Sequence, residues 1–315
     1  MKVGIMSCPG LGDGLISLLL AENLSQSGNE VEVFHAGVLC ELKKWFSSAT
    51  ILSLPAAYNE KLLDEYDHFF VFYDQGHPWM NHFISEGKKK EKVTVLNASS
   101  GRKNGSQPFY EDAYLESDRS MVENMELFCR RVLCLLPTTK KLTLNIPAAV
   151  GKDPKRVVIH ASGAKEGKRW DLEKFLRLYE HLKKKNFSPI FVFRESEKEE
   201  FAPLEGKVSV KFCKDCDELA RFLLTARFFI GNDSGVGHLA SSLGVPTVTI
   251  FRNKRGSKLW RPHFTKGKVV YPPSWILNLS FCRLRDKKWQ SFITVNSVLR
   301  SFETLAHEQK FSAKP

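Results

Sequence analysis

The stretch from residue 228 to residue 251 constrains the fold of this chain more than any other. Phe228 to Ile230 is a short apolar run that stops at Gly231, and Thr247 to Phe251 is a second, β-branched run, so both are predicted to be buried strands. The residues between them have the marks of a helix, which are polar N-cap candidates, leucines four residues apart and a closing Gly and Pro: Asn232, Asp233, Ser234, Leu239, Leu243, Gly244 and Pro246. The stretch therefore predicts a βαβ crossover.

Such a crossover suits an anionic ligand. The N-terminus of its helix presents unpaired amides and a partial positive charge above the strand ends, and small residues there let a ligand approach closely. Phosphate is the ligand that this arrangement favours. The alternative is a glycine-punctuated turn that binds nothing.

The whole string is more specific than its parts. Asn232-Asp233-Ser234-Gly235-x-x-His238-Leu-Ala, followed by Leu-Gly-x-Pro, resembles the C-terminal signature of glycosyltransferase family 9, the heptosyltransferases of lipopolysaccharide core assembly. The resemblance implies an α/β fold of GT-B architecture, in which two Rossmann-like domains face a central cleft. It also implies that Asp233, Ser234, Gly235 and His238 bind the donor substrate. A packing role against the sheet is the alternative for His238.

Length and pattern agree with two domains. A chain of 315 residues can bury two cores, and strands alternate with helices in both halves. A segment rich in proline, threonine and lysine, 137–153, is the predicted linker. We therefore expect an acceptor-binding Rossmann-like domain over residues 1–145, a nucleotide-sugar-binding Rossmann-like domain over 152–290, and a closing helix and tail over 291–315.

The first domain begins with a glycine-rich turn. Lys2 to Ser7 is predicted to be a strand, and a helix is expected from about Leu15 to Gln26. Family 9 members carry a Leu-Gly-Asp turn after their first strand, which Leu11-Gly12-Asp13 resembles. The resemblance makes Asp13 the catalytic base and Gly12 part of the substrate site. A helix N-cap is the alternative role for Asp13.

Two further blocks of the second domain are similar to the family pattern. Lys168, in a loop that ends Lys-Arg-Trp, is implied to contact the donor diphosphate, and an ammonium suits a leaving phosphate. Family members place an acidic residue after the next strand to bind the ribose, and here either Glu195 or Glu197 could serve. Ala161-Ser162 and Arg252-Asn253 depart from the family pattern, and the second departure adds positive charge near the donor site.

No metal ligands are predicted. Asp215-x-Asp217 matches the Asp-x-Asp of metal-dependent glycosyltransferases, but it precedes an amphipathic run and is better explained as a helix cap. Cys213-x-x-Cys216 has no second pair, so the seven cysteines of the chain are interpreted as reduced thiols.

The charge of the chain is unevenly distributed. Residues 1–150 hold 15 Lys and Arg against 18 Asp and Glu, whereas residues 151–315 hold 32 against 17. The half with the phosphate-type turn is therefore the basic half, which favours an anionic ligand there. Arg102, in a polar loop of the other half, is a candidate to meet an anionic acceptor, and a solvated loop is its alternative.

Together these features predict a metal-independent inverting glycosyltransferase. The resemblance implies a sugar donor with a nucleoside diphosphate, in particular ADP-heptose, no cofactor, and a lipid-linked anionic saccharide of the lipopolysaccharide inner core as acceptor. The sequence has no run of about 20 apolar residues and no cleavable signal. We therefore expect a cytoplasmic protein that touches the inner membrane face. It is expected to be a monomer with no nucleic-acid partner. A nucleotide-sugar epimerase-like enzyme of the same fold and a non-catalytic basic nucleotide- or nucleic-acid-binding protein are the alternatives.

Overall fold

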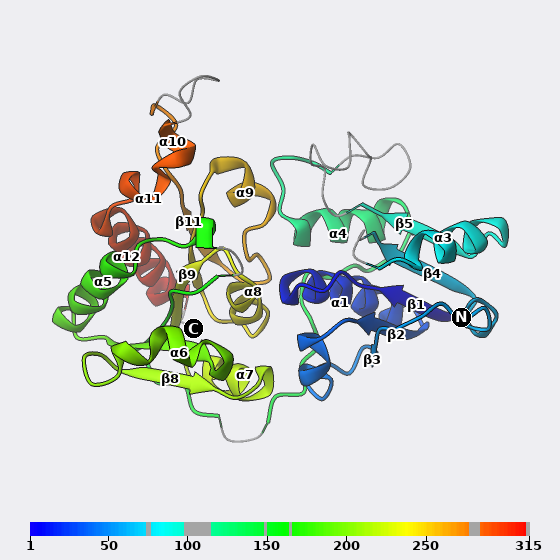
Figure 1. Ribbon diagram of the computed structural model, residues 1–315, viewed down its shortest axis with the longest axis horizontal. Helices are drawn as coiled ribbons and strands as arrows, with labels where there is room; N and C mark the ends of the chain where they lie inside the picture. The colour runs from blue at the N-terminus through cyan, green and yellow to red at the C-terminus, as the bar shows by residue number, and fades with distance from the viewer. Residues whose placement is uncertain (74–76, 98–114, 148–149, 164–165, 277–283, 313–315) are drawn as a thin grey trace. The chain divides into compact units, whose positions relative to one another are not determined.

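The computed structural model describes residues 1–73, 77–97, 115–147, 150–163, 166–276 and 284–312, and the chain divides into two compact units, Met1–Ile146 and Pro147–Pro315 (Figure 1). Each unit is an α/β domain built around one parallel sheet. Within the described part of the chain, no helix is long and apolar enough to cross a membrane.

The first unit contains a five-stranded parallel sheet in the order β3-β2-β1-β4-β5. Its strands are β1 Lys2–Met6, β2 Glu30–His35, β3 Thr50–Ser53, β4 His68–Phe72 and β5 Val93–Leu96. Its helices are α1 Leu11–Gln26, α2 Leu62–Glu65, α3 Met80–Lys89 and α4 Met121–Arg131, with a 3-10 turn, η1, at Val38–Leu42. The strand order reverses between β1 and β4, which is where open α/β sheets bind their ligands.

Helix α1 begins one turn earlier than the sequence predicted. Gly10 is its N-cap residue, and the Leu11-Gly12-Asp13 turn, expected to precede the helix, forms its first turn. Every residue from Gly14 to Leu24 is buried, as expected for a helix whose sides are nearly all apolar. Asp13 is therefore not the N-cap of this helix but its third residue.

The second unit contains a six-stranded parallel sheet in the order β11-β10-β9-β6-β7-β8. Its strands are β6 Arg156–His160, β7 Ser188–Arg194, β8 Val210–Cys213, β9 Phe228–Asn232, β10 Thr247–Ile250 and β11 Gly267–Val270. Its α-helices are α5 Leu172–Lys184, α6 Lys198–Phe201, α7 Cys216–Leu224, α8 Gly235–Ser242, α9 Lys254–Leu259, α10 Leu284–Lys287, α11 Trp289–Phe292 and α12 Val295–Ser312, with 3-10 turns η2 Glu166–Lys168, η3 Glu195–Glu197 and η4 Ala202–Leu204.

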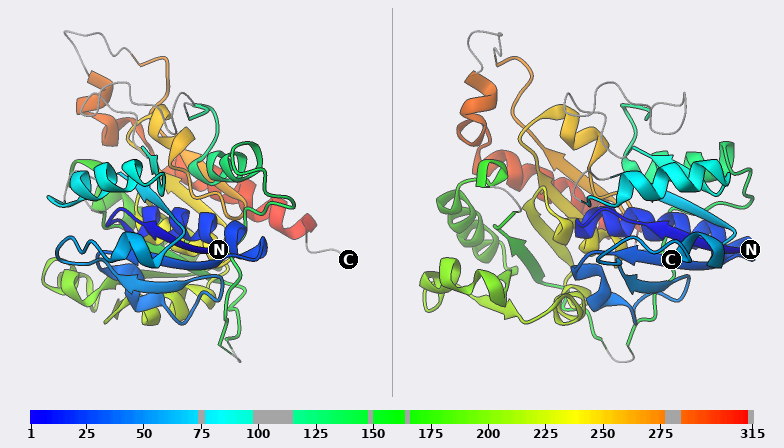
Figure 2. Two further views of the ribbon diagram at one scale, coloured as in Figure 1. Left: turned by 90° about the vertical axis from the view of Figure 1, so that its right-hand side faces the viewer. Right: turned by 45° about the vertical axis from the view of Figure 1, so that its right-hand side comes forward.

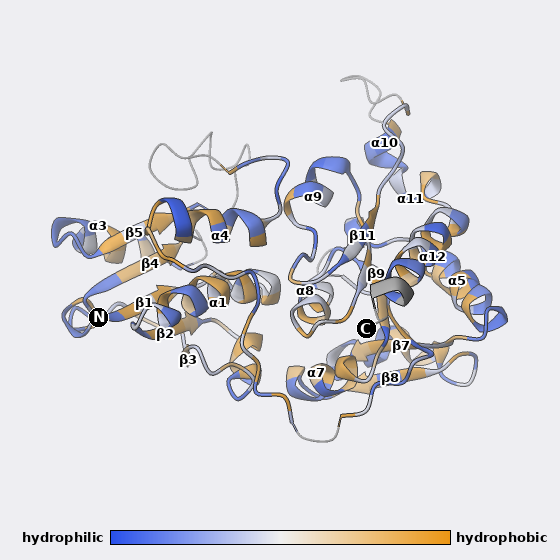
Figure 3. Ribbon diagram, turned by 180° about the vertical axis from the view of Figure 1, so that it is seen from behind, coloured by the Kyte–Doolittle hydropathy of each residue, from blue (hydrophilic) through white to orange (hydrophobic). Residues whose placement is uncertain are grey.

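Helices cover both faces of the second sheet, with α5 and α12 on one side and α8 on the other (Figures 1 and 2). The strands are hydrophobic and the outer surfaces of α5 and α9 are largely hydrophilic (Figure 3), as burial of one helix face requires. The core below α5 combines aromatic and aliphatic side chains from helix and strands, among them Trp170, Phe175, Phe191, Phe228 and Phe302.

The predicted βαβ crossover is present as β9, α8 and β10. Strands β9 and β10 are paired in parallel, with Phe229 opposite Thr247 and Asn232 opposite Ile250. The sequence did not predict strands β8 and β11, which are four residues each. Helix α4 ends at Arg131, and the chain has left helical geometry by Cys134, whose φ is 54°.

Candidate functional site

The strand order of the second sheet reverses between β6 and β9, and polar residues gather where these two strands end. His160 ends β6 and Asn232 ends β9, and His160 lies opposite Gly231 in the pairing. A Cβ on Gly231 would lie 2.9 Å from the carbonyl oxygen of His160, so only glycine allows this close pairing. The loops that leave β6 and β9 are thus held at the ligand-binding edge of the sheet.

Asn232 connects these two loops. It is fully buried, and its side-chain amide donates to the carbonyl of Ala161 at 2.7 Å while its carbonyl accepts from the backbone N–H of Trp170 at 3.0 Å. Trp170 is itself buried, packs edge-on against Phe175 and donates its indole N–H to Ile293. Trp170 is thus a packing residue, and Asn232 fixes both ends of the loop that carries Lys168.

Lys168 and Asp233 meet at this edge. The ammonium of Lys168 lies 2.9 Å from a carboxylate oxygen of Asp233, although 65 residues separate them in sequence. The Lys168 side chain is 49% exposed and that of Asp233 is 18% exposed. The structure therefore brings together two of the predicted substrate-binding residues, with the lysine accessible to an incoming anion.

The N-terminus of α8 lies next to this ion pair. Ser234 is the N-cap residue and Gly235 the first helical residue, but the Ser234 side chain makes no capping hydrogen bond. Its hydroxyl instead lies 3.4 Å from Nδ1 of His160. The backbone carbonyl of Ser234 accepts from the N–H of Gly237 at 3.1 Å, but its side chain does not compete with an anionic ligand for the first-turn amides.

His238 is a buried part of the same helix. It is 4% exposed, its ring is hydrogen-bonded to the backbone of Trp260, and Nδ1 has no partner within the part of the chain that the structure describes. Burial lowers the pKa of His238, against opposing effects of Asp233 and of the bond to Trp260. His238 is thus a neutral packing residue at physiological pH.

His160 is also held neutral. Burial lowers its pKa, which nearby Glu197 raises and nearby Arg169 lowers further. Its ring stacks with that of Phe229 at 6.5 Å between centroids. The sequence analysis placed no site role on His160.

The two acidic candidates for ribose binding have different surroundings. Glu197 accepts a hydrogen bond from the hydroxyl of Ser162 and another, at 2.9 Å, from the backbone N–H of Arg194. Glu195, immediately after β7, is half exposed and forms an ion pair with the half-exposed side chain of Lys198, at 3.1 Å. Glu197 is therefore used to fix the loop after β6, while Glu195 can exchange its partner more easily.

In the first unit, Asp13 lies at the corresponding edge of the sheet. It is half-buried in the first turn of α1, and a Cβ on Gly10 would lie 2.4 Å from Oδ2 of Asp13. The carboxylate thus lies directly over the backbone of Gly10, and Gly12 is the helical residue next to it. A carboxylate in a first turn is stabilised by the helix dipole.

His35 supports this turn from below. It is fully buried at the end of β2, and its Nε2 lies 3.3 Å from the carbonyl oxygen of Gly10. That carbonyl also accepts from the backbone N–H of Gly14 at 2.9 Å. The sequence analysis missed His35, although a histidine at the end of a strand next to a glycine turn was the available signal.

The remaining features of the sequence analysis are an arginine, an Asp-x-Asp motif and a pair of cysteines. Arg102 lies outside the described residues. Asp215 caps α7, since its side chain accepts from the backbone N–H of Glu218 at 2.8 Å. Cys213 and Cys216 are buried free thiols, and burial raises the pKa of Cys213 to about 12. Among the described residues, no three His, Cys, Asp or Glu side chains converge as metal ligands would.

Comparison with known proteins supports the resemblance seen in the sequence. Residues 130–271 match glycosyltransferase family 9 (heptosyltransferase). No curated protein matches the chain.

Solved structures extend the similarity over nearly the whole chain. Heptosyltransferase WaaC of E. coli with ADP is 17% identical, with a TM-score of 0.65 over 97% of this chain and 100% of that one. A family 9 glycosyltransferase from Veillonella parvula is 16% identical (TM-score 0.70; 98% and 97% covered), and E. coli ADP-heptose lps heptosyltransferase II is 13% identical (TM-score 0.69; 98% and 100% covered). The predicted α/β fold with two Rossmann-like domains is confirmed, and the solved structures that share it are GT-B heptosyltransferases.

Proposed function

We propose that the protein transfers a sugar from a nucleoside-diphosphate donor to a saccharide acceptor, since residues 130–271 match glycosyltransferase family 9 (heptosyltransferase). The observation that carries the proposal is the ion pair of Lys168 with Asp233 beside the N-terminus of α8. A cation and a set of helix amides at one sheet edge can bind a diphosphate and neutralise it as a leaving group.

The donor that we propose is ADP-heptose. The heptosyltransferase WaaC is described with ADP, and heptosyltransferase II is named for ADP-heptose. Lys168 and the amides at Ser234 and Gly235 would hold the diphosphate. Asp233 would accept hydrogen bonds from hydroxyl groups of the donor sugar. Glu195, with its exchangeable partner, is the better candidate for the ribose hydroxyls, because Glu197 already accepts bonds from Ser162 and from the backbone of Arg194.

Asp13 would act as the general base of an inverting transfer. It accepts the proton of the acceptor hydroxyl, whose oxygen forms a bond to the anomeric carbon while the bond from that carbon to the diphosphate oxygen breaks. Lys168 and the α8 amides stabilise the negative charge that develops on the departing diphosphate.

The acceptor and the setting follow from the same family. We propose a lipid-linked anionic saccharide of the lipopolysaccharide inner core, reached by a cytoplasmic monomer at the inner membrane face. Metal ions would not be needed, because Lys168 takes the charge-neutralising role.

Donor binding and sugar transfer are tested in separate experiments, and the binding of ADP comes first. Calorimetric titration with ADP should show a Kd at least about tenfold weaker for Lys168→Ala than for the parent protein, as expected for losing a charge-assisted bond. Lys184→Ala, an exposed lysine on α5, is the matched control and should bind ADP normally. Unchanged ADP affinity in Lys168→Ala would contradict the proposed donor site.

The transfer itself is tested with ADP-heptose and a lipopolysaccharide inner-core acceptor. ADP release should require the acceptor, should persist in EDTA, and should be abolished by Asp13→Ala while ADP still binds. Conversion of the donor without any acceptor would instead indicate an epimerase-like enzyme.

A further inference from the structure

A short segment after β10 carries an unusual density of positive charge. Residues 252–261, the basic segment, contain five basic residues and no acidic one: Arg252, Lys254, Arg255, Lys258 and Arg261. Half of its residues are exposed, and helix α9 within it is strongly hydrophilic in Figure 3. The basic segment starts at Arg252-Asn253, where the chain departs from the family pattern.

The basic segment lies at the same sheet edge as the proposed donor site. Ile250 at the end of β10 is paired with Asn232 at the end of β9, and its carbonyl accepts from the backbone N–H of Asp233 at 3.0 Å. Arg252 is only two residues beyond Ile250. The positive charges therefore begin next to the Lys168–Asp233 pair.

The segment is fixed against α8 rather than loose. The side chain of Asn253 caps α9 by accepting from the backbone N–H of Gly256 at 2.8 Å, and Ser257 is buried. The backbone of Trp260 is hydrogen-bonded to the ring of His238 on α8. These contacts hold the backbone of the basic segment in place, and its charged side chains extend from that fixed backbone.

Three of these cations lack an ionic partner. In the described part of the chain, neither Arg252 nor Lys254 nor Lys258 is ion-paired, and all three are exposed. Like charges placed together beside the positive end of a helix repel each other, and the repulsion is relieved when an anion binds. Clustered unpaired cations at a ligand-binding edge therefore indicate an anionic group in the bound substrate.

We propose that the basic segment binds a second anionic group of the substrate, a phosphate or carboxylate separate from the donor diphosphate. This inference depends on the proposed function in one respect, which is that the donor diphosphate occupies the site at Lys168. Arg252 and Lys254 are the specificity-determining residues, since they come first after β10. The chain thereby selects a phosphorylated or carboxylated saccharide over its neutral counterpart.

The test uses inorganic phosphate as the probe, titrated into the full-length protein saturated with ADP and followed by NMR. The parent protein should bind phosphate in this state, and Arg252→Gln/Lys254→Gln should bind it about tenfold more weakly, since two charge-assisted contacts are lost. Lys184→Gln/Lys207→Gln removes two exposed positive charges elsewhere in the same unit and should bind phosphate like the parent. Both double variants should keep the parent affinity for ADP.

Equal phosphate binding by Arg252→Gln/Lys254→Gln and the parent would overturn the inference, as would an equal loss in Lys184→Gln/Lys207→Gln. Competition identifies which substrate carries the anion. Loss of phosphate binding when ADP-glucose replaces ADP in the saturated protein places the site beside the donor sugar, and unchanged phosphate binding assigns it to the acceptor. Failure of the proposed function is distinguishable, because it would appear as an unchanged ADP affinity in Lys168→Ala, whatever the phosphate result.

Discussion

Nε2 of His35 lies 3.3 Å from the carbonyl oxygen of Gly10, the residue over whose backbone the carboxylate of Asp13 is placed. Because a carbonyl can only accept, the buried ring must carry its proton on Nε2. Burial lowers the pKa of His35 and the bond to Gly10 raises it, so the ring is neutral near pH 7. A neutral histidine thus fixes the turn that holds the proposed base.

Replacing His35 should affect turnover more than nucleotide binding. His35→Leu leaves the Gly10 carbonyl with one bond fewer and should cost about 1–2 kcal/mol of stability. Since donor residues lie in the other unit, kcat should fall several-fold while the Kd for ADP is unchanged. His35→Gln, which can donate to the same carbonyl, should recover part of the lost kcat. Equal kcat in His35→Leu and the parent would show that the turn holds Asp13 without this bond.

Adding one methyl group to Gly10 should displace the proposed base. The new Cβ would lie 2.4 Å from Oδ2 of Asp13, and the carboxylate can rotate away at low cost to the fold. Gly10→Ala should therefore melt within a few degrees of the parent but transfer sugar much more slowly. Gly151→Ala, where a Cβ meets nothing within 4 Å, is the matched control. Normal transfer by Gly10→Ala would mean that the position of this carboxylate is unimportant.

Asn232→Leu should weaken the donor site from within the core. The substitution leaves the carbonyl of Ala161 and the N–H of Trp170 buried without a partner, a loss of about 2–4 kcal/mol for two such groups. The unfolding free energy, measured in urea, should fall by that amount and the Kd for ADP should rise, because the loop with Lys168 loses its anchor. Asn186→Leu, at an exposed turn, should leave ADP binding unchanged.

Stability should fall on mild acidification. Burial lowers the folded-state pKa of His35, His68, His160 and His238, whereas the same side chains in an unfolded chain have pKa values of about 6.5. Below that pH the unfolded state binds more protons than the folded state, so the unfolding free energy decreases as pH falls from 6.5. The urea midpoint should thus be lower at pH 5.5 than at pH 7.5.

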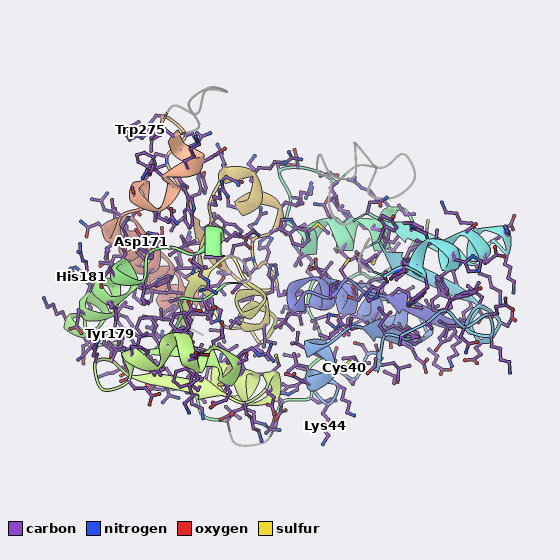
Figure 4. All side chains as sticks on the ribbon, viewed as in Figure 1. Cys40, Lys44, Asp171, Tyr179, His181 and Trp275 are labelled. Carbon is purple, nitrogen blue, oxygen red and sulfur yellow. The ribbon has the colours of Figure 1, made fainter. Side chains whose placement is uncertain are left out.

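Removing one buried histidine should make this decrease smaller. His160→Gln is expected to lose less stability between the two pH values than the parent, even from a lower starting point. His181→Gln, on the outer side of α5 (Figure 4), should retain the full decrease. An equal decrease in His160→Gln would exclude His160 as a contributor.

Local sequence pattern predicted much of the fold. The apolar run that starts at Lys2 and the strand–helix–strand pattern around residue 239 depend on neighbours in sequence, and these elements formed close to where they were expected. Strands β8 and β11 were not predicted because only the last of the four residues of each strand is buried, which weakens the apolar signal.

Contacts between distant loops could not be read in the same way. The pairing of Lys168 with Asp233 spans 65 residues and follows from the strand order, which places β6 beside β9. Without that order, Asn232 was interpreted as a possible helix cap rather than as the link between two loops. The choice between Glu195 and Glu197 likewise required the bond of Glu197 to Ser162.

The ion pair at the second sheet edge has one further consequence. With Lys168 and Asp233 already neutralising each other, an arriving ligand must exchange partners with them rather than fill an empty positive site. A weakly charged metabolite gains too little binding free energy from that exchange. A doubly charged group can bind the ammonium of Lys168 and release the carboxylate of Asp233 in the same step. The Lys168 site of the resting protein therefore discriminates against small, weakly charged anions. The carboxylate of Asp233 becomes available only after the correct ligand has bound to Lys168.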